Sequence, residues 1–324
     1  MKKIAITGSN GFIGKSLCKT FSKLNRPIVG IIRSGSSLKS LSDINTAIVG
    51  NINSNTNWKK SLENCDVVIH CAGKAHVMNS KDDTYDYYSV NVEGTKNLAE
   101  QAVKFGVKKL IFLSSIKVNG ENTNKRIIDF DTINRKNFKF SHNHLPNPTD
   151  SYAKSKFEAE KILWDISLKT NLEVIVVRLP LVYGPEVKGN LARLIKITKL
   201  GLPLPLKSIQ NKRSMIGIDN LIDFLIKCVD HPDAIGKTFL ISDGEDLSTP
   251  DLIKLIAKSI DRPVRLFHFP ILFLKFFSLF VGRKKEIDRL IGSLQIDITY
   301  SKKILNWKPK ISVFEGIRRM VQGK

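Results

Sequence analysis

The sequence predicts an α/β fold in which a doubly wound parallel sheet carries a smaller, discontinuous C-terminal lobe. Three observations support this prediction. An apolar run leads into three spaced glycines near the N-terminus, β-type runs then alternate with helical segments, and the alternation is lost after Pro180. Strands separated by helices imply crossover connections, and crossover connections join parallel strands.

The expected strands and helices alternate along the first part of the chain. Apolar runs rich in β-branched residues predict strands at Lys3–Thr7, Ile28–Ile32, Thr46–Val49, Val67–Cys71, Leu110–Ser114, Glu173–Val177 and Thr238–Ile241. Apolar residues at helical spacing predict helices at Phe12–Leu24, Val90–Phe105, Tyr152–Leu168 and Leu221–Asp230. The polar stretch Asn122–Pro148 has no such period and predicts a long loop over the site.

This pattern divides the 324 residues into two lobes. Residues 1–178 with roughly 212–244 are expected to form the nucleotide-binding domain. Residues 179–211 and 245–324 are expected to form the second lobe, which would bind the rest of the ligand.

The N-terminal run indicates a Rossmann-type dinucleotide site. It reads Ile4-Ala5-Ile6-Thr7-Gly8-Ser9-Asn10-Gly11-Phe12-Ile13-Gly14. Glycines at this spacing allow a strand to turn tightly into a helix and allow the backbone to approach a pyrophosphate at the helix N-terminus. The expected cofactor contacts in this run are Gly8, Asn10, Gly11, Phe12, Ile13 and Gly14.

The composition excludes several other classes. The net charge of +22 is spread along the chain, with no basic block interleaved with aromatics, so it favours an anionic small substrate over nucleic acid. The four cysteines, Cys18, Cys65, Cys71 and Cys228, are scattered, which predicts reduced thiols and no metal site. The start Met1-Lys2-Lys3 has no apolar signal segment, so a cytoplasmic location is expected.

One apolar stretch, Phe267–Val281, is interrupted by Lys275 and followed by Arg283-Lys284-Lys285. It is shorter than the roughly 20 apolar residues that span a bilayer. The favoured interpretation is a buried or subunit-facing helix. The alternative is a helix that lies on a surface, with weak contact to a membrane through residues 267–285.

Tyr152 and Lys156 form a Tyr-x-x-x-Lys pair, one helical turn apart and therefore on one face of a helix. A nearby ammonium favours the phenolate, so we expect Lys156 to lower the pKa of Tyr152 and allow it to act as a general acid or base. Ser114-Ser115 ends the preceding expected strand, and Asn91 lies near the start of the helix before it.

With these residues the chain resembles the extended short-chain dehydrogenase/reductases, the nucleotide-sugar epimerase and dehydratase superfamily. The shared motifs extend over nearly the whole length: Thr7-Gly8-x-x-Gly11-Phe12-Ile13-Gly14, Asp66-Val67-Val68-Ile69-His70-Cys71-Ala72-Gly73, Asn91-Val92-x-Gly94-Thr95, Ser114-Ser115-x-x-Val118-x-Gly120, Tyr152-x-x-x-Lys156, Arg178-x-Pro180-x-x-Tyr183-Gly184-Pro185 and Leu305-x-Trp307-x-Pro309.

The resemblance implies a role for each matching residue. In the catalytic group, Ser115 holds the substrate oxygen, Tyr152 transfers its proton, and Lys156 also grips the nicotinamide ribose. On the cofactor side, Asp66 lies near the adenine, Asn91 fixes a helix kink, and further contacts fall at Val67, Cys71, Ala72 and Gly73. On the substrate side, the nucleoside diphosphate is bound by Asn190, Leu191 and Arg213, with Arg289 as a further candidate.

Simpler interpretations remain open for some of these residues. Asn91 is alternatively an ordinary helix cap, and Arg289 an exposed arginine. His70 is expected to be a strand residue whose ring is hydrogen-bonded, whereas His76 lies closer to the expected nicotinamide face.

Departures from the family pattern narrow the reaction. Dehydratases place an Asp-Glu pair after the catalytic serine, decarboxylases place a glutamate second, and epimerase-reductases place a cysteine first. This chain has Ile116 and Lys117 at those positions. The remaining reactions are C4 epimerisation and C4 ketoreduction.

The cofactor residues favour reduction. The second strand ends without the acid that NAD-preferring members carry, and Arg33, with Ser34 and Ser36, favours the 2′-phosphate of NADP(H), with NAD(H) as the alternative. Further likeness points to enzymes of bacterial surface-polysaccharide and O-antigen synthesis. We therefore expect NADPH-dependent reduction of a UDP-4-keto-6-deoxy-N-acetylhexosamine to a UDP-N-acetylquinovosamine-type product.

Two alternatives stay open: a UDP-glucose or UDP-GlcNAc 4-epimerase with bound NAD, and, more remotely, a non-catalytic NADPH-binding protein. The family commonly dimerises through two helices per subunit, here Val90–Phe105 and Tyr152–Leu168, so a homodimer is expected.

Overall fold

A seven-stranded parallel sheet forms the centre of the computed structural model, which describes residues 1–35, 41, 43–74, 84–124, 138–280, 282 and 284–323. The strand order is β3-β2-β1-β4-β5-β6-β9. These strands are β1 (Ile4–Thr7), β2 (Ile28–Arg33), β3 (Thr46–Val49), β4 (Val67–His70), β5 (Lys109–Ser115), β6 (Glu173–Leu179) and β9 (Lys237–Leu240). The doubly wound fold is confirmed, and each strand lies within two residues of its expected bounds.

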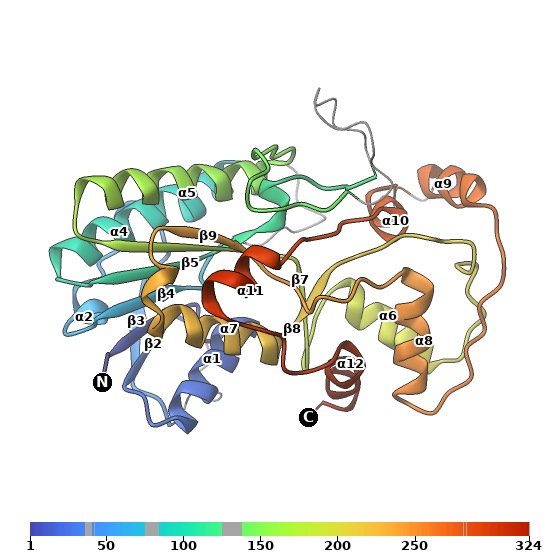
Figure 1. The fold of residues 1–324 in the computed structure, drawn as a ribbon, viewed down its shortest axis with the longest axis horizontal. Helices are drawn as coiled ribbons and strands as arrows, with labels where there is room; N and C mark the ends of the chain where they lie inside the picture. Colours follow the sequence, from blue (N-terminus) through green and yellow to red (C-terminus); the bar gives the residue numbers. More distant parts are fainter. Residues whose placement is uncertain are drawn as a thin grey trace.

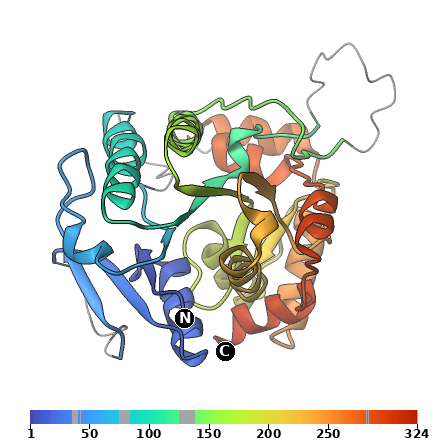
Figure 2. The ribbon, with the colours of Figure 1, turned by 60° about the vertical axis from the view of Figure 1, so that its left-hand side comes forward.

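Helices cover both faces of the sheet (Figures 1 and 2). On one face, α1 (Phe12–Lys23) and α7 (Ile218–Asp230) pack over Ile4 and Ile6. On the other face, α2 (Lys59–Leu62), α4 (Gly94–Lys104) and α5 (Ser151–Lys169) pack over Ala5 and its neighbours. Successive strand residues point to opposite faces, so a strand buried on both sides must be apolar throughout, as β1 is.

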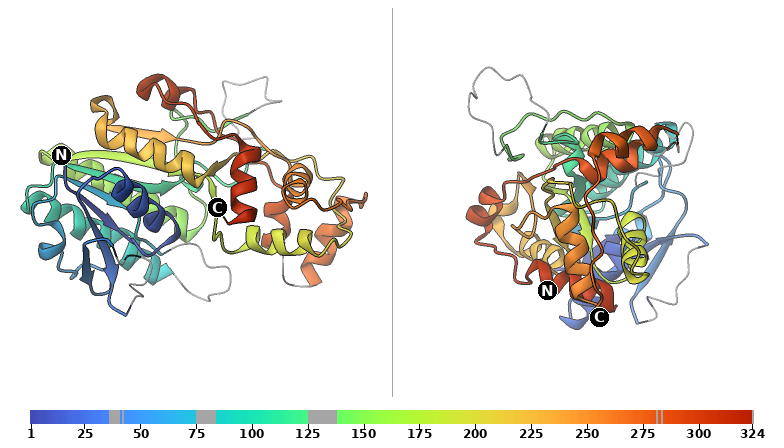
Figure 3. Two further views of the ribbon diagram at one scale, coloured as in Figure 1. Left: turned by 90° about the horizontal axis from the view of Figure 1, so that it is seen from below. Right: turned by 90° about the vertical axis from the view of Figure 1, so that its right-hand side faces the viewer.

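The second lobe lies beyond the carboxyl edge of the sheet (Figure 3). It contains the two-stranded parallel sheet of β7 (Leu181–Tyr183) and β8 (Met215–Gly217). Its helices are α6 (Asn190–Lys199), α8 (Thr249–Lys258), α9 (Ile271–Phe280), α10 (Lys284–Ile291) and α12 (Val313–Gln322). Tyr183, Met215, Ile256 and Ile317 pack together in a separate core for this lobe.

One C-terminal segment differs from the expected division of the chain. Helix α11 (Thr299–Leu305) returns toward the sheet, where Leu305 and Trp307 join the core beside α1 and α7. The indole Nε1 of Trp307 donates to Asp223 of α7 at 2.8 Å. Residues 299–307 therefore pack on the first domain, although 245–324 was expected to belong to the second lobe.

The expected loop over the site is held at both of its described ends, and residues 125–137 lie outside the described part of the chain. At the start of the loop Thr123 N donates to Ser293 O of the second lobe at 2.9 Å, and at its end Asn147 N donates to Val118 O in η2 (Ile116–Val118) at 2.8 Å. Phe140 N donates to Gln295 O of the second lobe at 2.9 Å. The loop ends therefore connect the two lobes. Within the described ranges, no helix is long and apolar enough to cross a membrane.

The glycines of the β1–α1 turn are required by backbone conformation and by space. Gly8 has φ +68°, and a Cβ there would lie 3.0 Å from the backbone of Ala72. A Cβ on Gly14 would lie 2.2 Å from Gly8 O, and backbone atoms cannot move aside as a flexible side chain does. These contacts bring β1, α1 and the end of β4 closer together than any other residue type allows.

We expect Gly14→Ala to lower the free energy of unfolding by about 3 kcal/mol, at the upper end of overpacking costs, because the obstacle is backbone. Gly50→Ala is the matched control, since a Cβ at Gly50 meets nothing within 4 Å. Urea unfolding of both variants measures the difference. Equal stability of the two variants would contradict the packing argument.

Candidate active site

The candidate cofactor site lies at the carboxyl edge of the sheet, where the strand order reverses between β1 and β4. Ligands of open α/β sheets bind at such a switch point. The N-cap of α1, Gly11, makes no side-chain cap, so no side chain covers the first amides of the helix there. Opposite, Ala72 N donates to Thr7 Oγ1 at 3.0 Å and fixes the Cys71–Gly73 segment beside the turn. A glycine turn of this shape fits a pyrophosphate.

The ends of β2 and β3 form the next part of this edge. Arg33 is exposed at the end of β2, and it pairs in register with Val49 of β3. Ser34 N donates to Val49 O at 2.8 Å, while the predicted neighbour Ser36 lies outside the described residues. Asn51 follows β3 on the same edge and is exposed. Asn51 is not predicted from the sequence, because only the position of β3 in the sheet places it on this edge.

Asp66 and Val67 do not lie on this edge, and their expected place beside the adenine is wrong. Val67 begins β4 and Asp66 precedes it, which places them about 10 Å and 13 Å from the carboxyl end of the strand at the usual rise per residue. Asp66 instead accepts a hydrogen bond from Lys3 N at 3.0 Å, and Val67 is buried in the core. The motif match assigned cofactor contacts to Asp66 and Val67 as well as to Cys71, Ala72 and Gly73, but only the last three follow the carboxyl end of β4.

The three predicted catalytic residues come together at the end of β5 and the start of α5. Ser115 ends β5, is buried, and accepts a hydrogen bond from Lys117 N at 3.2 Å. Tyr152 lies in the first turn of α5. Its ring is edge-on to that of Tyr87, and the two ring centroids are 5.9 Å apart. Burial raises the pKa of Tyr152 to about 12, and a side-chain hydrogen bond with Ser115 opposes this shift.

The Lys156 ammonium lies behind this pair. Its Nζ donates to Leu113 O at 3.0 Å and lies 4.5 Å from the centre of the Phe112 ring. Burial lowers the pKa of Lys156 to about 8, with Glu160 acting in the opposite direction. The expectation that Lys156 lowers the pKa of Tyr152 is wrong for this structure, because burial of the phenol outweighs the other effects on it.

Asn91 joins the catalytic helix to the cofactor edge from a π-helical turn, η1 (Tyr88–Glu93), which separates α3 (Thr84–Tyr87) from α4. Its Oδ1 accepts from Lys74 N at 2.8 Å, and its Nδ2 donates to Lys74 O at 3.1 Å and to Ser155 Oγ at 3.0 Å. A π turn interrupts the regular helix, so the expected irregularity at Asn91 is present. Ordinary capping does not account for three such bonds.

A buried polar network supports the catalytic residues from behind. The Glu160 carboxylate, one turn after Lys156, binds the Arg178 guanidinium through two bonds of 3.0 and 2.6 Å. Ser114 Oγ donates to the same carboxylate, and Arg178 Nη1 donates to Asn119 Oδ1 at 3.0 Å. The network joins α5, β5, β6 and η2.

Lys117 holds the start of the catalytic helix. Its ammonium pairs with Asp150 and with Glu121, the latter at 2.8 Å. Asp150 is the N-cap of α5 and accepts from Ala153 N at 2.7 Å. The ammonium at this position is therefore part of the local structure.

The predicted substrate residues lie in the second lobe. Arg213 Nη1 donates to Arg289 O at 2.9 Å and to Gly292 O at 3.2 Å, both near the end of α10. Burial and the neighbouring Arg289 lower the pKa of Arg213. Among the residues described, no carboxylate is in ion-pair distance of Arg213. Asn190 and Leu191 begin α6, where Asn190 is exposed and Leu191 is buried.

His70 is fully hydrogen-bonded, as expected. Its ring bonds Thr7 at 2.7 Å and Thr95 at 3.1 Å, and burial lowers its pKa to about 3. His76 lies outside the described residues. The cysteines are free thiols, and the described part of the chain holds no cluster of ligands for a metal.

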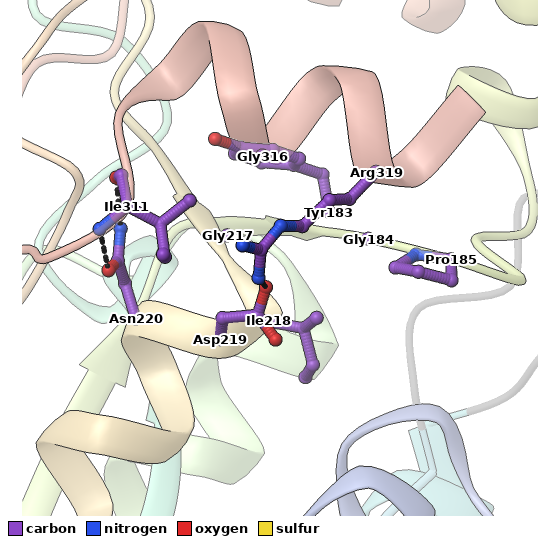
Figure 4. Close-up of a pocket in the computed structure, with 10 residues that line it drawn as sticks. All are labelled: Tyr183, Gly184, Pro185, Gly217, Ile218, Asp219, Asn220, Ile311, Gly316 and Arg319. Carbon is purple, nitrogen blue, oxygen red and sulfur yellow. Dashed lines mark hydrogen bonds and ion pairs between the residues drawn. The ribbon is translucent and has the colours of Figure 1, made fainter. Parts of the chain in front are cut away.

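A small cavity lies where the two lobes meet (Figure 4). Tyr183, Asn220 and Arg319 are among the residues that line it. Asn220 Nδ2 donates to Ile311 O at 2.8 Å, and Arg319 pairs with Asp219 at 2.9 Å across it. Its volume of about 10 Å³ suits one water molecule at most. The cavity lies at the contact between the two lobes, and none of the predicted catalytic residues lines it.

The fold and the site define a class that comparison with known proteins supports. The model of the NAD dependent epimerase/dehydratase family matches residues 4–242, and the chain belongs to this family. A protein named UDP-glucose 4-epimerase from Vibrio cholerae is 40% identical over 325 residues, 99% of this chain and 95% of that one.

More distant matches agree with the fold. The N-acetyl-alpha-D-glucosaminyl-diphospho-ditrans,octacis-undecaprenol 4-epimerase of Escherichia coli O157:H7 is 27% identical over 65% of this chain and 60% of its own length. The solved UDP-glucuronic acid 4-epimerase of Bacillus cereus in complex with NAD superposes with a TM-score of 0.77, at 22% identity over 99% of this chain and 98% of that one.

The buried network predicts a large effect on stability. We expect Glu160→Gln to lower the free energy of unfolding by about 3–5 kcal/mol, because the Arg178 charge would stay buried without its carboxylate. Glu158→Gln is the control, since the exposed Glu158–Lys161 pair is worth under about 1 kcal/mol. Urea unfolding measures both. Similar losses would contradict the assignment.

The lowered pKa of Lys156 predicts a pH dependence of stability. The folded protein loses this proton near pH 8, whereas the unfolded chain keeps it to about pH 10.5. The unfolded state then binds more protons between these values, so the contribution of Lys156 to the free energy of unfolding rises with pH across that window.

We therefore expect the stability of Lys156→Met, relative to the native protein, to fall between pH 7.5 and pH 9.5 in urea titrations. The exposed Lys154→Met serves as the control and should show no such change. A difference for Lys156→Met that is independent of pH would contradict the lowered pKa.

Proposed function

We propose that this protein transfers hydride between a nicotinamide cofactor and C4 of a UDP-linked hexose. The favoured reaction is NADPH-dependent reduction of a UDP-4-keto-6-deoxy-N-acetylhexosamine. The observation that carries the proposal is the hydrogen-bonded Ser115–Tyr152 pair at the carboxyl edge, with the Lys156 ammonium behind it. A bound nicotinamide would supply the hydride, which no side chain of the protein can provide.

Each catalytic side chain has a role in ketone reduction. The Ser115 hydroxyl orients the ketone oxygen, and the Tyr152 phenol gives its proton to the oxygen as negative charge develops there. Burial holds the pKa of Tyr152 near 12, so the phenol is protonated at neutral pH, as a proton donor must be. Lys156 adds positive charge beside the developing alkoxide, which lowers the barrier electrostatically.

The two residues after Ser115 argue against elimination of water, the reaction of the dehydratases. Elimination of water requires an acid and a base besides the tyrosine. Ile116 is buried and apolar, and the Lys117 ammonium is engaged by Asp150 and Glu121. Neither position supplies the second acid–base group, which leaves hydride transfer with a single proton transfer.

The second lobe supports recognition of a diphosphate. Arg213 donates only to backbone carbonyls among its described contacts, and it lies beside Arg289. Two neighbouring guanidinium groups repel each other, and a diphosphate between them would relieve that repulsion through charge-assisted hydrogen bonds. The Asn190–Leu191 start of α6 is assigned to the nucleoside. Binding of these remote groups positions the sugar for hydride transfer.

A second candidate is 4-epimerisation with a retained NAD. The name of the 40% identical Vibrio relative favours it. An epimerase returns its hydride to the other face of the same ketone, so it uses the same three catalytic residues. The end of β2 favours the reductase instead, because Arg33 stands there without an acid.

We also propose a homodimer formed through α4 and α5, which lie side by side on one face of the sheet (Figure 1).

The cofactor preference predicts tighter binding of NADPH than of NADH. Arg33→Asp should shift the preference toward NADH by about 1–3 kcal/mol, because it removes a charge-assisted bond to the 2′-phosphate. Fluorescence titration measures both affinities. Lys104→Asp makes the same charge change at the far end of α4 and should leave the preference unchanged. Equal or tighter NADH binding by the native protein would overturn the NADP assignment.

The reaction is tested by incubating the protein with UDP-GlcNAc and NADPH, with and without a separate 4,6-dehydratase. We expect NADPH oxidation only when the dehydratase is present, with a product two mass units heavier than the keto sugar. Interconversion of UDP-GlcNAc or UDP-glucose with its C4 epimer, without net cofactor use, would establish the epimerase instead. Tyr152→Phe should lower turnover by about 10²–10⁴-fold while cofactor binding stays intact. Near-normal turnover would refute its catalytic role.

A further inference from the structure

Helix α9 carries the largest exposed apolar surface of its lobe. Leu272, Phe273, Phe276, Leu279 and Phe280 all lie on this helix, with exposed fractions from 53% at Phe276 to 80% at Leu272. The helix lies at the outer end of the second lobe, next to α10 and far from the central sheet (Figure 1). The expectation of a helix buried within the chain is therefore wrong for these side chains. Solvent exposure of three phenylalanines within one short helix requires an explanation.

The exposed side chains share one face. At 3.6 residues per turn, these five positions fall within an arc of roughly 120°. Leu274 lies on the opposite side of the helix and packs against the apolar cluster of Leu206, Ile209 and Ile253. The inward side of α9 is thus already packed against its own lobe. The outward face, defined here as the α9 face, is exposed to solvent.

The charge around the α9 face indicates the partner. Between Asp261 and Glu286 the sequence contains no acidic residue and six basic ones, Arg262, Arg265, Lys275, Arg283, Lys284 and Lys285. The whole chain carries a net charge of +22. Aromatic and aliphatic side chains on one face of a short helix, in a stretch of sequence whose charged residues are all basic, are the composition of helices that lie in the interface of an anionic bilayer.

We propose that the α9 face docks this protein onto the headgroup region of an anionic membrane. A helix of ten residues is about 15 Å long, so it lies in the interface and does not span the hydrocarbon core. A second copy of the chain fits the face less well. Both copies would carry the same basic stretch of sequence, and five side chains are far fewer than the roughly 20–30 residues per partner of a standard interface.

Docking at this place would bring α10, which contacts α9, close to the membrane. The carbonyl of Arg289, near the end of α10, binds Arg213 in the assigned diphosphate site. The α9 face and the assigned diphosphate site are therefore connected through one short helix, α10. The proposal itself does not depend on which reaction the protein catalyses.

The test is co-sedimentation of the full-length protein with large unilamellar vesicles. We expect binding to vesicles of 30% phosphatidylglycerol and 70% phosphatidylcholine, at least tenfold weaker binding to pure phosphatidylcholine, and weakening with added salt. Leu272→Ser/Phe280→Ser should reduce binding at least tenfold. The matched control is Leu200→Ser, which removes an exposed leucine of the same lobe and should bind as the native protein does.

Three results would overturn the proposal. The first is no binding to either vesicle, and the second is equal loss of binding in Leu200→Ser and in the double variant. The third is a halved molar mass of the double variant in light scattering without vesicles, which would show that a second copy covers the face. Circular dichroism and NADPH binding of the double variant establish that it is folded. If no variant shows the proposed enzymatic activity, that finding counts against the proposed function. It does not change the conclusion from the vesicle-binding measurements.

Discussion

The bidentate pair between Glu160 and Arg178 holds the catalytic edge together. Both side chains are buried, and their bonds extend to Ser114 and Asn119, so one carboxylate ties α5 to β5, β6 and η2. A buried ion pair of this kind contributes less to net stability than its Coulomb energy suggests, because both charges lose their hydration. The main effect of the pair is to position the predicted catalytic residues. Ser115 follows Ser114 of the network in the chain, and Lys156 lies one helical turn before Glu160.

The environment of the catalytic residues follows from this burial. The same exclusion of water raises the pKa of the Tyr152 phenol and lowers that of the Lys156 ammonium. Both shifts favour the neutral form of each group. A protonated phenol beside a serine hydroxyl is prepared to give a proton to an alkoxide. The geometry is thus consistent with reduction of a ketone, and the choice between reduction and epimerisation rests on the cofactor.

Positive charge is used differently in the two lobes. In the first domain, the Lys117 ammonium is matched by Asp150 and Glu121, and it stabilises the start of the catalytic helix. In the second lobe, Arg213 is held in place by backbone carbonyls beside a second arginine, an arrangement that suits an anion. The exposed apolar α9 face lies in a stretch of sequence between Asp261 and Glu286 whose charged residues are all basic. One strongly basic composition therefore stabilises local structure and, in our proposals, also binds the substrate and contacts a membrane.

The sequence by itself determined the parallel, doubly wound sheet, the glycine turn and the shared helix face of Tyr152 and Lys156, because these depend on local patterns. Alternating apolar runs predict a parallel sheet, and Gly8 and Gly14 stand where backbone atoms approach too closely for a Cβ. Tyr152 and Lys156 share a helix face by spacing alone. Each of these inferences uses residues that are near one another in the chain.

Only the tertiary structure decided two properties of the residues. The first is the end of the strand at which a residue lies, and the second is whether other segments bury it. Asp66 matched a motif but lies at the amino end of β4, away from the cofactor edge. The pKa of Tyr152 rises because burial outweighs the effects of its polar neighbours, and burial depends on packing by distant segments. The apolar run at 267–281 could have been buried or exposed. The inward packing of Leu274 left the opposite face of its helix in solvent, and no local pattern determines which side a lobe covers.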